Sequence, residues 1–100
     1  MDWQFGCDPG KRALLMVTRD IDLLDLEEIF DDPFRIKFED VRRAFGEARH
    51  LVIGMSRGIF VTAVYTIRGN IVWLITAWPS NRKERERYVE TRLNHLQNRS

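Results

Sequence analysis

Charged and tyrosine side chains that could act on a phosphodiester gather at a few places in this 100-residue chain. Cleavage of RNA by its own 2′-hydroxyl needs a proton acceptor, a proton donor for the leaving oxygen, and positive charge on the phosphorane. Arginine suits the last role because its planar fork matches phosphate oxygens. Charged residues that only pair with one another on a solvent-exposed helix would give the same residue types in the sequence, without any catalytic role. The residues concerned are Asp40, Arg42, Arg43, Glu47, Arg49, Arg68, Glu84, Arg85 and Tyr88.

Other chemistries lack the residues that they need. Cys7 is the single cysteine, and His50 and His95 lie far apart, so no zinc-ligand spacing exists. The sequence contains no glycine-rich phosphate loop and no Ser-His-Asp pattern. We therefore expect no metal and no cofactor.

The formal charge of +1 is unevenly divided. Residues 1–47 hold seven Lys/Arg and twelve Asp/Glu, a balance of −5, and residues 48–100 hold nine and three, a balance of +6. The basic half could therefore approach a polyanion, although both halves could also be ordinary surface.

The length supports one domain over residues 1–100. No run of about eighteen apolar residues is present, so we expect no membrane span. The N-terminus does not resemble a signal peptide, and a lone cysteine fits a reducing compartment. We therefore expect a cytoplasmic protein.

The elements that must position the charged residues form an α+β pattern. Asp8-Pro9 is typical of a helix start, and Asp25 with Glu28 has capping-box spacing. Short turns at Arg57-Gly58 and Arg68-Gly69 force antiparallel hairpins. We predict short helices over 11–17 and 26–30, a four-stranded antiparallel sheet from 34–39, 51–53, 59–67 and 71–78, a loop over 40–47, and a C-terminal helix capped by Ser80 or Asn81.

Two apolar patterns suggest covered surfaces. Val89, Leu93 and Leu96 recur at helical spacing, so we expect them to be buried within the domain or under a partner. The two long strands are apolar throughout, which favours a sheet covered on both faces. Strand alternation places Trp78 on the face of Val72, Leu74 and Thr76, opposite Trp73, Ile75 and Ala77.

The segments FEDVRRAFGEARHLVIG, VYTIRG and LITAWPSNRKERERY together resemble the BrnT family of toxins. The family pattern is D-x-R, then Y/F-G-E-x-R, I-G, V-Y-T-x-R, and I-S-A-R followed by E-R-x-x-Y. CDPGK and IFDDP resemble its W-D-P-x-K and V-F-x-D-P, so the similarity spans residues 8–90.

This resemblance implies a RelE-like fold and metal-independent RNA cleavage. It implies two partners, an RNA substrate and a cognate antitoxin of the BrnA type that covers the toxin and binds operator DNA. A homo- or hetero-oligomer is compatible with these partners. The motif matches carry over Glu47, Arg49, Arg68, Glu84 and Arg85 as candidate catalytic residues, without fixing which is acid and which is base. Arg42, Trp78 and Tyr88 are candidate RNA-binding residues.

The chain departs from the family pattern at two places. Thr18-Arg19-Asp20 replaces K-H-G, and Ile75-Thr76-Ala77-Trp78 replaces I-S-A-R. Arg19 could supply the missing charge, and Trp78 could either extend the core or stack on a base. The alternative is a catalytically degenerate toxin homologue that serves as a protein- or nucleic-acid-binding module.

Overall fold

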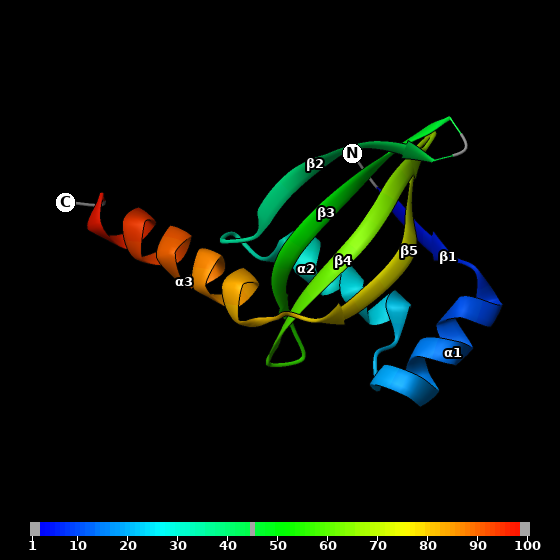
Figure 1. Ribbon diagram of the computed structural model, residues 1–100, viewed down its shortest axis with the longest axis horizontal. Coiled ribbons are helices and arrows are strands. Elements are labelled where there is room, and N and C mark those ends of the chain that lie inside the picture. The colour runs from blue at the N-terminus through cyan, green and yellow to red at the C-terminus, as the bar shows by residue number, and fades with distance from the viewer. Residues whose placement is uncertain (1–2, 45, 99–100) are drawn as a thin grey trace.

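The computed structural model describes residues 3–44 and 46–98, with side chains for all of these except 39–44. Figure 1 shows a twisted sheet with helices at its sides and a C-terminal helix that extends away from it. The elements are β1 (Gln4–Cys7), α1 (Pro9–Arg19), a 3₁₀ turn η1 (Leu23–Leu26), α2 (Glu27–Asp31), β2 (Ile36–Ala44), β3 (Glu47–Ser56), β4 (Ile59–Arg68), β5 (Ile71–Pro79) and α3 (Arg82–Gln97). The α+β class and the C-terminal helix agree with the prediction.

The sheet differs from the predicted four antiparallel strands. It has five strands in the order β1-β5-β4-β3-β2, and β1 pairs in parallel with β5 from Gln4–Ile71 to Cys7–Leu74. The sequence prediction missed β1 because four residues that include Gly6 carry too little alternation to indicate a strand. A parallel pairing also depends on contacts far apart in the chain. A RelE-like fold stays a prediction.

The predicted loop over 40–47 is wrong as well. Most of it is strand, because β2 continues to Ala44 and β3 begins at Glu47. Gly46 has a φ of 76°, a left-handed conformation that glycine adopts without strain, and it closes this connection tightly. The charged residues of 40–44 have no apolar alternation, which is why the sequence did not reveal them as strand.

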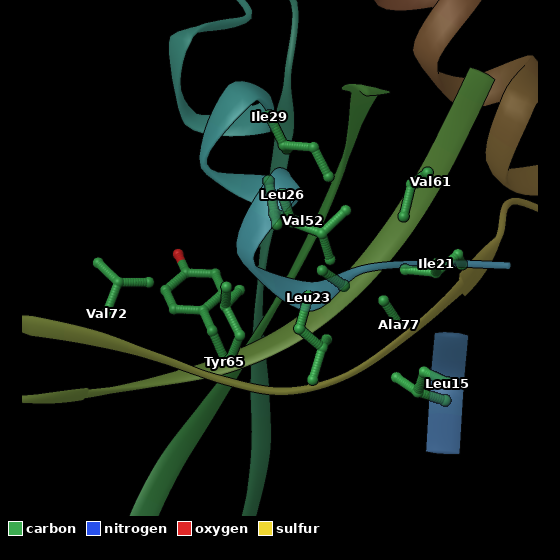
Figure 2. Close-up of a cluster of buried hydrophobic side chains, with 12 residues drawn as sticks. Leu15, Ile21, Leu23, Leu26, Ile29, Val52, Val61, Tyr65, Val72 and Ala77 are labelled. Atoms are coloured by element: carbon green, nitrogen blue, oxygen red, sulfur yellow. The ribbon is translucent and has the colours of Figure 1, made fainter. Parts of the chain in front are cut away.

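One face of the sheet carries the core. Val52, Ala63, Tyr65, Leu74 and Ala77 pack there against apolar side chains of α1, η1 and α2. Figure 2 shows this cluster, with Leu15, Leu23, Leu26 and Ile29 of the helical segments facing the strands. We call the opposite side of the sheet the outer face.

A glycine in β3 sets how closely α2 lies on the core face. A Cβ at Gly54 would stand 2.7 Å from Cγ2 of Ile29, so a side chain at this position would force the helix away. The Ile-Gly motif of the sequence is therefore explained by packing.

The helix starts agree only in part with the predicted caps. Asp8 Oδ2 accepts from Lys11 N at 2.9 Å, and Asn81, one of the two predicted caps of α3, forms a capping box with Glu84. The Asp25–Glu28 box is absent, because α2 continues directly from η1 and has no side-chain cap. Asp22 caps η1 instead, by accepting from Leu24 N.

The apolar stripe of α3 is exposed. Val89, Leu93 and Leu96 are 43%, 53% and 48% exposed, so the expected burial within the domain is wrong. Figure 1 shows the reason, since α3 leaves the end of β5 and extends away from the sheet. Burial under a partner stays a prediction. No helix in the described part of the chain is long and apolar enough to cross a membrane.

Candidate functional site

The antiparallel pairing of β3 with β4 brings Glu47 and Arg68 together on the outer face. Glu47 begins β3 and Arg68 ends β4, and the connections beside them contain Gly46 and Gly69 with positive φ. Figure 1 shows these strand ends at the same end of the sheet. Arg68 Nε and Nη2 donate to Glu47 Oε1 and Oε2 at 2.8 and 3.2 Å. This bidentate pair presents a guanidinium fork that is 47% exposed.

The pair fixes the ionisation of both partners. The hydrogen bonds from Arg68 hold the pKa of Glu47 below its usual value, and nearby Arg49 adds to the effect, against a smaller opposing effect of burial. The hydrogen bond to Glu47 in turn raises the pKa of Arg68. At neutral pH Glu47 is thus a carboxylate and Arg68 a guanidinium cation.

Arg49 completes this group. Strand alternation puts it on the outer face with Glu47, and its register partner in β2 is Asp40. Its Nε is buried and has no hydrogen-bond partner among the residues that the structure describes. We call Glu47, Arg49 and Arg68 the hairpin-end cluster.

The other two carried-over residues lie at the start of α3. Glu84 Oε1 accepts from Asn81 N at 2.8 Å and from Trp78 Nε1 at 3.1 Å. Arg85 Nη1 donates to the carbonyl oxygen of Ser80 at 2.8 Å. Both side chains therefore hold the junction between β5 and α3.

The two groups do not meet. β4 pairs with β5 from Arg68–Ile71 at one end to Val61–Pro79 at the other. These pairs are about 23 Å apart at about 3.3 Å per residue. Arg85 therefore lies at the opposite end of the sheet from Arg49 and Arg68, since β5 crosses the sheet before α3 begins.

Trp78 lies on the opposite face from the one that alternation predicts. Val64 pairs with Thr76 and Tyr65 with Leu74, so Ile75 is an extra residue in β5. Such a bulge reverses the alternation that follows it. Ala77 therefore joins the core, and Trp78 lies half-buried on the outer face.

The two departures from the family pattern meet beside Trp78. β1 covers only residues 71–74 of β5, so the later part of β5 is a free edge. Arg19, at the end of α1, donates from Nη1 to the carbonyl oxygen of Ala77 at 2.7 Å and to Thr76 Oγ1 at 3.4 Å. An arginine from α1 thus lies next to the strand position where the family pattern has its own arginine.

Tyr88 is placed for packing. Its side chain is 2% exposed and its hydroxyl donates to Asp32 Oδ2 at 2.8 Å. Burial, then the bond to Asp32, raises the pKa of Tyr88 to about 12. The same carboxylate accepts from Phe34 N and Met55 N, so Asp32 ties α2, β3 and α3 together. In the sequence, Asp32 stood out only as part of the segment IFDDP.

Arg42 and the two histidines belong to neither of the two groups described above. The side chain of Arg42 lies outside the described residues, and its backbone belongs to β2 near the hairpin-end cluster. The ring of His50 lies tilted against that of Tyr65, and the ring of His95 meets that of Phe34 edge-on. Among the described residues, no three His, Cys, Asp or Glu side chains gather as a metal site.

Comparison with models of known families identifies a relationship for most of the chain. The model of a family described as "Ribonuclease toxin, BrnT, of type II toxin-antitoxin system" matches residues 7–84. A search among curated proteins found no match. The match begins at the last residue of β1 and includes α1, η1, α2, β2–β5, the hairpin-end cluster and Glu84.

Proposed function

This chain belongs to the BrnT family of ribonuclease toxins of type II toxin–antitoxin systems, and we propose that it cleaves RNA at its hairpin-end cluster. The observation that carries the proposal is the bidentate Glu47–Arg68 pair on the outer face, with Arg49 beside it. The pair combines a phosphate-binding fork with a carboxylate on one surface.

Binding of RNA changes the base strength of Glu47 in this proposal. Without RNA, the fork of Arg68 is engaged by Glu47, and this contact is the main reason for the low pKa of the carboxyl. When a phosphate takes over the fork, Glu47 loses those hydrogen bonds, its pKa rises, and it becomes a stronger base. Glu47 then accepts the proton of the 2′-hydroxyl as its oxygen bonds to phosphorus, and Arg68 and Arg49 stabilise the phosphorane. The bond from phosphorus to the 5′-oxygen then breaks, and the leaving oxygen takes a proton from water. The reaction uses side chains of the chain itself and no metal.

The residues at the other end have positioning roles. Glu84 caps α3 and holds the indole of Trp78, and Arg85 holds the Ser80 carbonyl. Both can shape where RNA lies without touching the scissile bond. Arg42, whose backbone lies in β2, is kept as an RNA-binding candidate.

The antitoxin that the family implies binds the exposed stripe of α3 in this proposal. Val89, Leu93 and Leu96 leave apolar surface in water that a partner would cover, and the resemblance predicts a partner of the BrnA type. Leu93→Asp should abolish capture of the co-expressed product of a neighbouring antitoxin gene. Thr91→Asp adds the same charge on the other side of α3 and should leave capture intact.

A second function is binding without cleavage. The observation in its favour is that Trp78 and Arg19 occupy the positions where the family pattern has arginine and histidine. A degenerate homologue would still bind RNA or an antitoxin but would leave RNA intact.

Incubation of the purified chain with single-stranded RNA tests the proposal and separates the two functions. We expect products with 2′,3′-cyclic phosphate and 5′-hydroxyl ends, formed in the presence of a chelator. Glu47→Gln should slow their formation by about 10²-fold or more. Arg12→Ala is the matched control, because Arg12 makes a bidentate pair with Asp22 of similar length away from the outer face. Bound but uncut RNA would favour the second function.

A further inference from the structure

The bulge in β5 places two tryptophans on one surface. Thr66 pairs with Trp73 and Thr62 with Trp78, and Thr62 and Thr66 share a face of β4. Without the extra residue at Ile75, the two indoles would lie on opposite faces, since their positions differ by an odd number. Their β4 partners are about 13 Å apart at about 3.3 Å per residue. The outer face therefore carries two aromatic side chains along one strand.

Each indole is held in place by a neighbour. Trp78 Nε1 donates to Glu84, which is itself fixed as part of the α3 cap. Trp73 lies against Gly6 of β1, where a Cβ would approach its Cζ3 to 3.1 Å. Both rings are only half-buried. Both indole rings are thus held by neighbouring residues while part of each ring stays exposed.

A guanidinium group accompanies each indole. The Cζ of Arg68 lies 4.8 Å from the centroid of the Trp73 ring, close enough for a cation–π contact. Arg19 is anchored through Nη1 on Ala77, the residue before Trp78. Only Nη1 of Arg19 donates to acceptors among the described residues, so Nε and Nη2 stay free for a ligand. The carboxylates nearby, Glu47 and Glu84, are both engaged in hydrogen bonds.

We propose that Trp73 and Trp78 are the two stacking platforms of one single-stranded RNA site, in which Arg68 leaves the ring of Trp73 to bind a phosphate and Arg19 binds a second phosphate beside Trp78. Aromatic rings interleaved with arginines suit unstacked bases and their phosphate backbone. This site deepens the proposed ribonuclease function and rests on it. It places the scissile phosphate near Trp73 and the flanking nucleotides toward Trp78.

Binding of a 2′-O-methyl RNA of about twelve nucleotides tests the site without cleavage, because the attacking hydroxyl is blocked. Fluorescence anisotropy of the labelled RNA gives the Kd. Trp73→Ala and Trp78→Ala should each weaken binding about 5- to 150-fold, and the Phe variants should recover most of the loss. Trp3→Ala removes an indole that is 45% exposed and lies before β1, and it should leave the Kd unchanged.

The outcomes separate this site from the proposed function. If folded Trp73→Ala and Trp78→Ala bind RNA like the wild type while the wild type cleaves RNA, the stacking site is wrong and the ribonuclease function stands. If the wild type neither binds nor cleaves RNA, both fail. Loss of antitoxin capture with an unchanged RNA Kd in Trp78→Ala would also overturn the site, since it would assign the outer face to a protein. If an Ala variant does not fold, Trp73→Leu and Trp78→Leu replace it, because leucine keeps apolar volume but offers no aromatic ring to a base. RNA binding like that of the wild type in these variants would overturn the site.

Discussion

Replacing Tyr88 with Phe removes one hydroxyl from the contact that joins α3 to the rest of the molecule. The hydroxyl donates to Asp32 Oδ2, which also accepts from Met55 N, while Phe34 N donates to Oδ1. Asp32 therefore keeps two backbone donors, and the cost is that of one hydrogen bond to a charged group, about 2 kcal/mol at pH 7. For a domain of this size the melting temperature should fall by about 8–16 °C.

The dependence on pH gives an independent check. The pKa of Tyr88 is raised from its ordinary value of 10 to about 12 in the folded protein. The contribution of Tyr88 is thus fully present below pH 10 and is lost as the pH rises toward 12. Two pKa units correspond to about 2.7 kcal/mol. The stability advantage of the wild type over Tyr88→Phe, about 2 kcal/mol at pH 7, should therefore be lost as the pH rises from 10 through 12.

Urea unfolding at several pH values measures this difference. Tyr65 also has a pKa raised by burial, but both proteins retain it, so its effect cancels. Tyr65→Phe is the control for loss of a hydroxyl from an equally buried ring. A difference between wild type and Tyr88→Phe that stays constant from pH 8 to 12 would refute the contact with Asp32.

Three further predictions concern the site and the packing. Arg68→Ala should move the acid limb of kcat/KM up toward the ordinary pKa of Glu47, because the main cause of the lowered value is gone; an unmoved limb would show that Glu47 is not the titrating base. Gly54→Ala should cost about 1–3 kcal/mol in urea unfolding, since the new Cβ meets Ile29, and an unchanged midpoint would contradict this close approach. Leu93→Ala should cost less than about 1 kcal/mol in the isolated chain, because a side chain that is 53% exposed loses little burial; a loss of 2–5 kcal/mol would mean that α3 packs elsewhere.

Local signals in the sequence predicted the elements that depend on local chemistry. Asn81 and Glu84 marked the start of α3, and the glycine turns marked the hairpins of β3, β4 and β5. The pattern of β1 is only four residues long, and its partner β5 lies more than sixty positions away. Pairing at such a distance leaves no local trace in the sequence.

The site was harder to predict for two reasons. No turn residue in the sequence marks the bulge at Ile75. The bulge nevertheless places Trp78 on the other face of the sheet, the face on which Trp73 lies. The direction of β5 explains why Arg85 lies apart from Arg68. β5 starts beside Arg68 and runs to the opposite end of the sheet, where α3 and Arg85 follow. The order of the motifs in the sequence therefore grouped Arg68 with Arg85, although they lie at opposite ends of the sheet. The strand register is needed to identify the hairpin-end cluster.

Single-turnover cleavage of one RNA by Arg68→Ala and Arg85→Ala tests the central claim most directly. The two substitutions remove the same side chain from opposite ends of the sheet. Arg68→Ala should lower the rate of cleavage by about 10²-fold or more, because it removes charge from the phosphorane. Arg85→Ala should stay within a few-fold of the wild type once folding is matched, since its side chain holds the Ser80 carbonyl. The reverse order of effects would contradict cleavage at the hairpin-end cluster and move the active site to the start of α3.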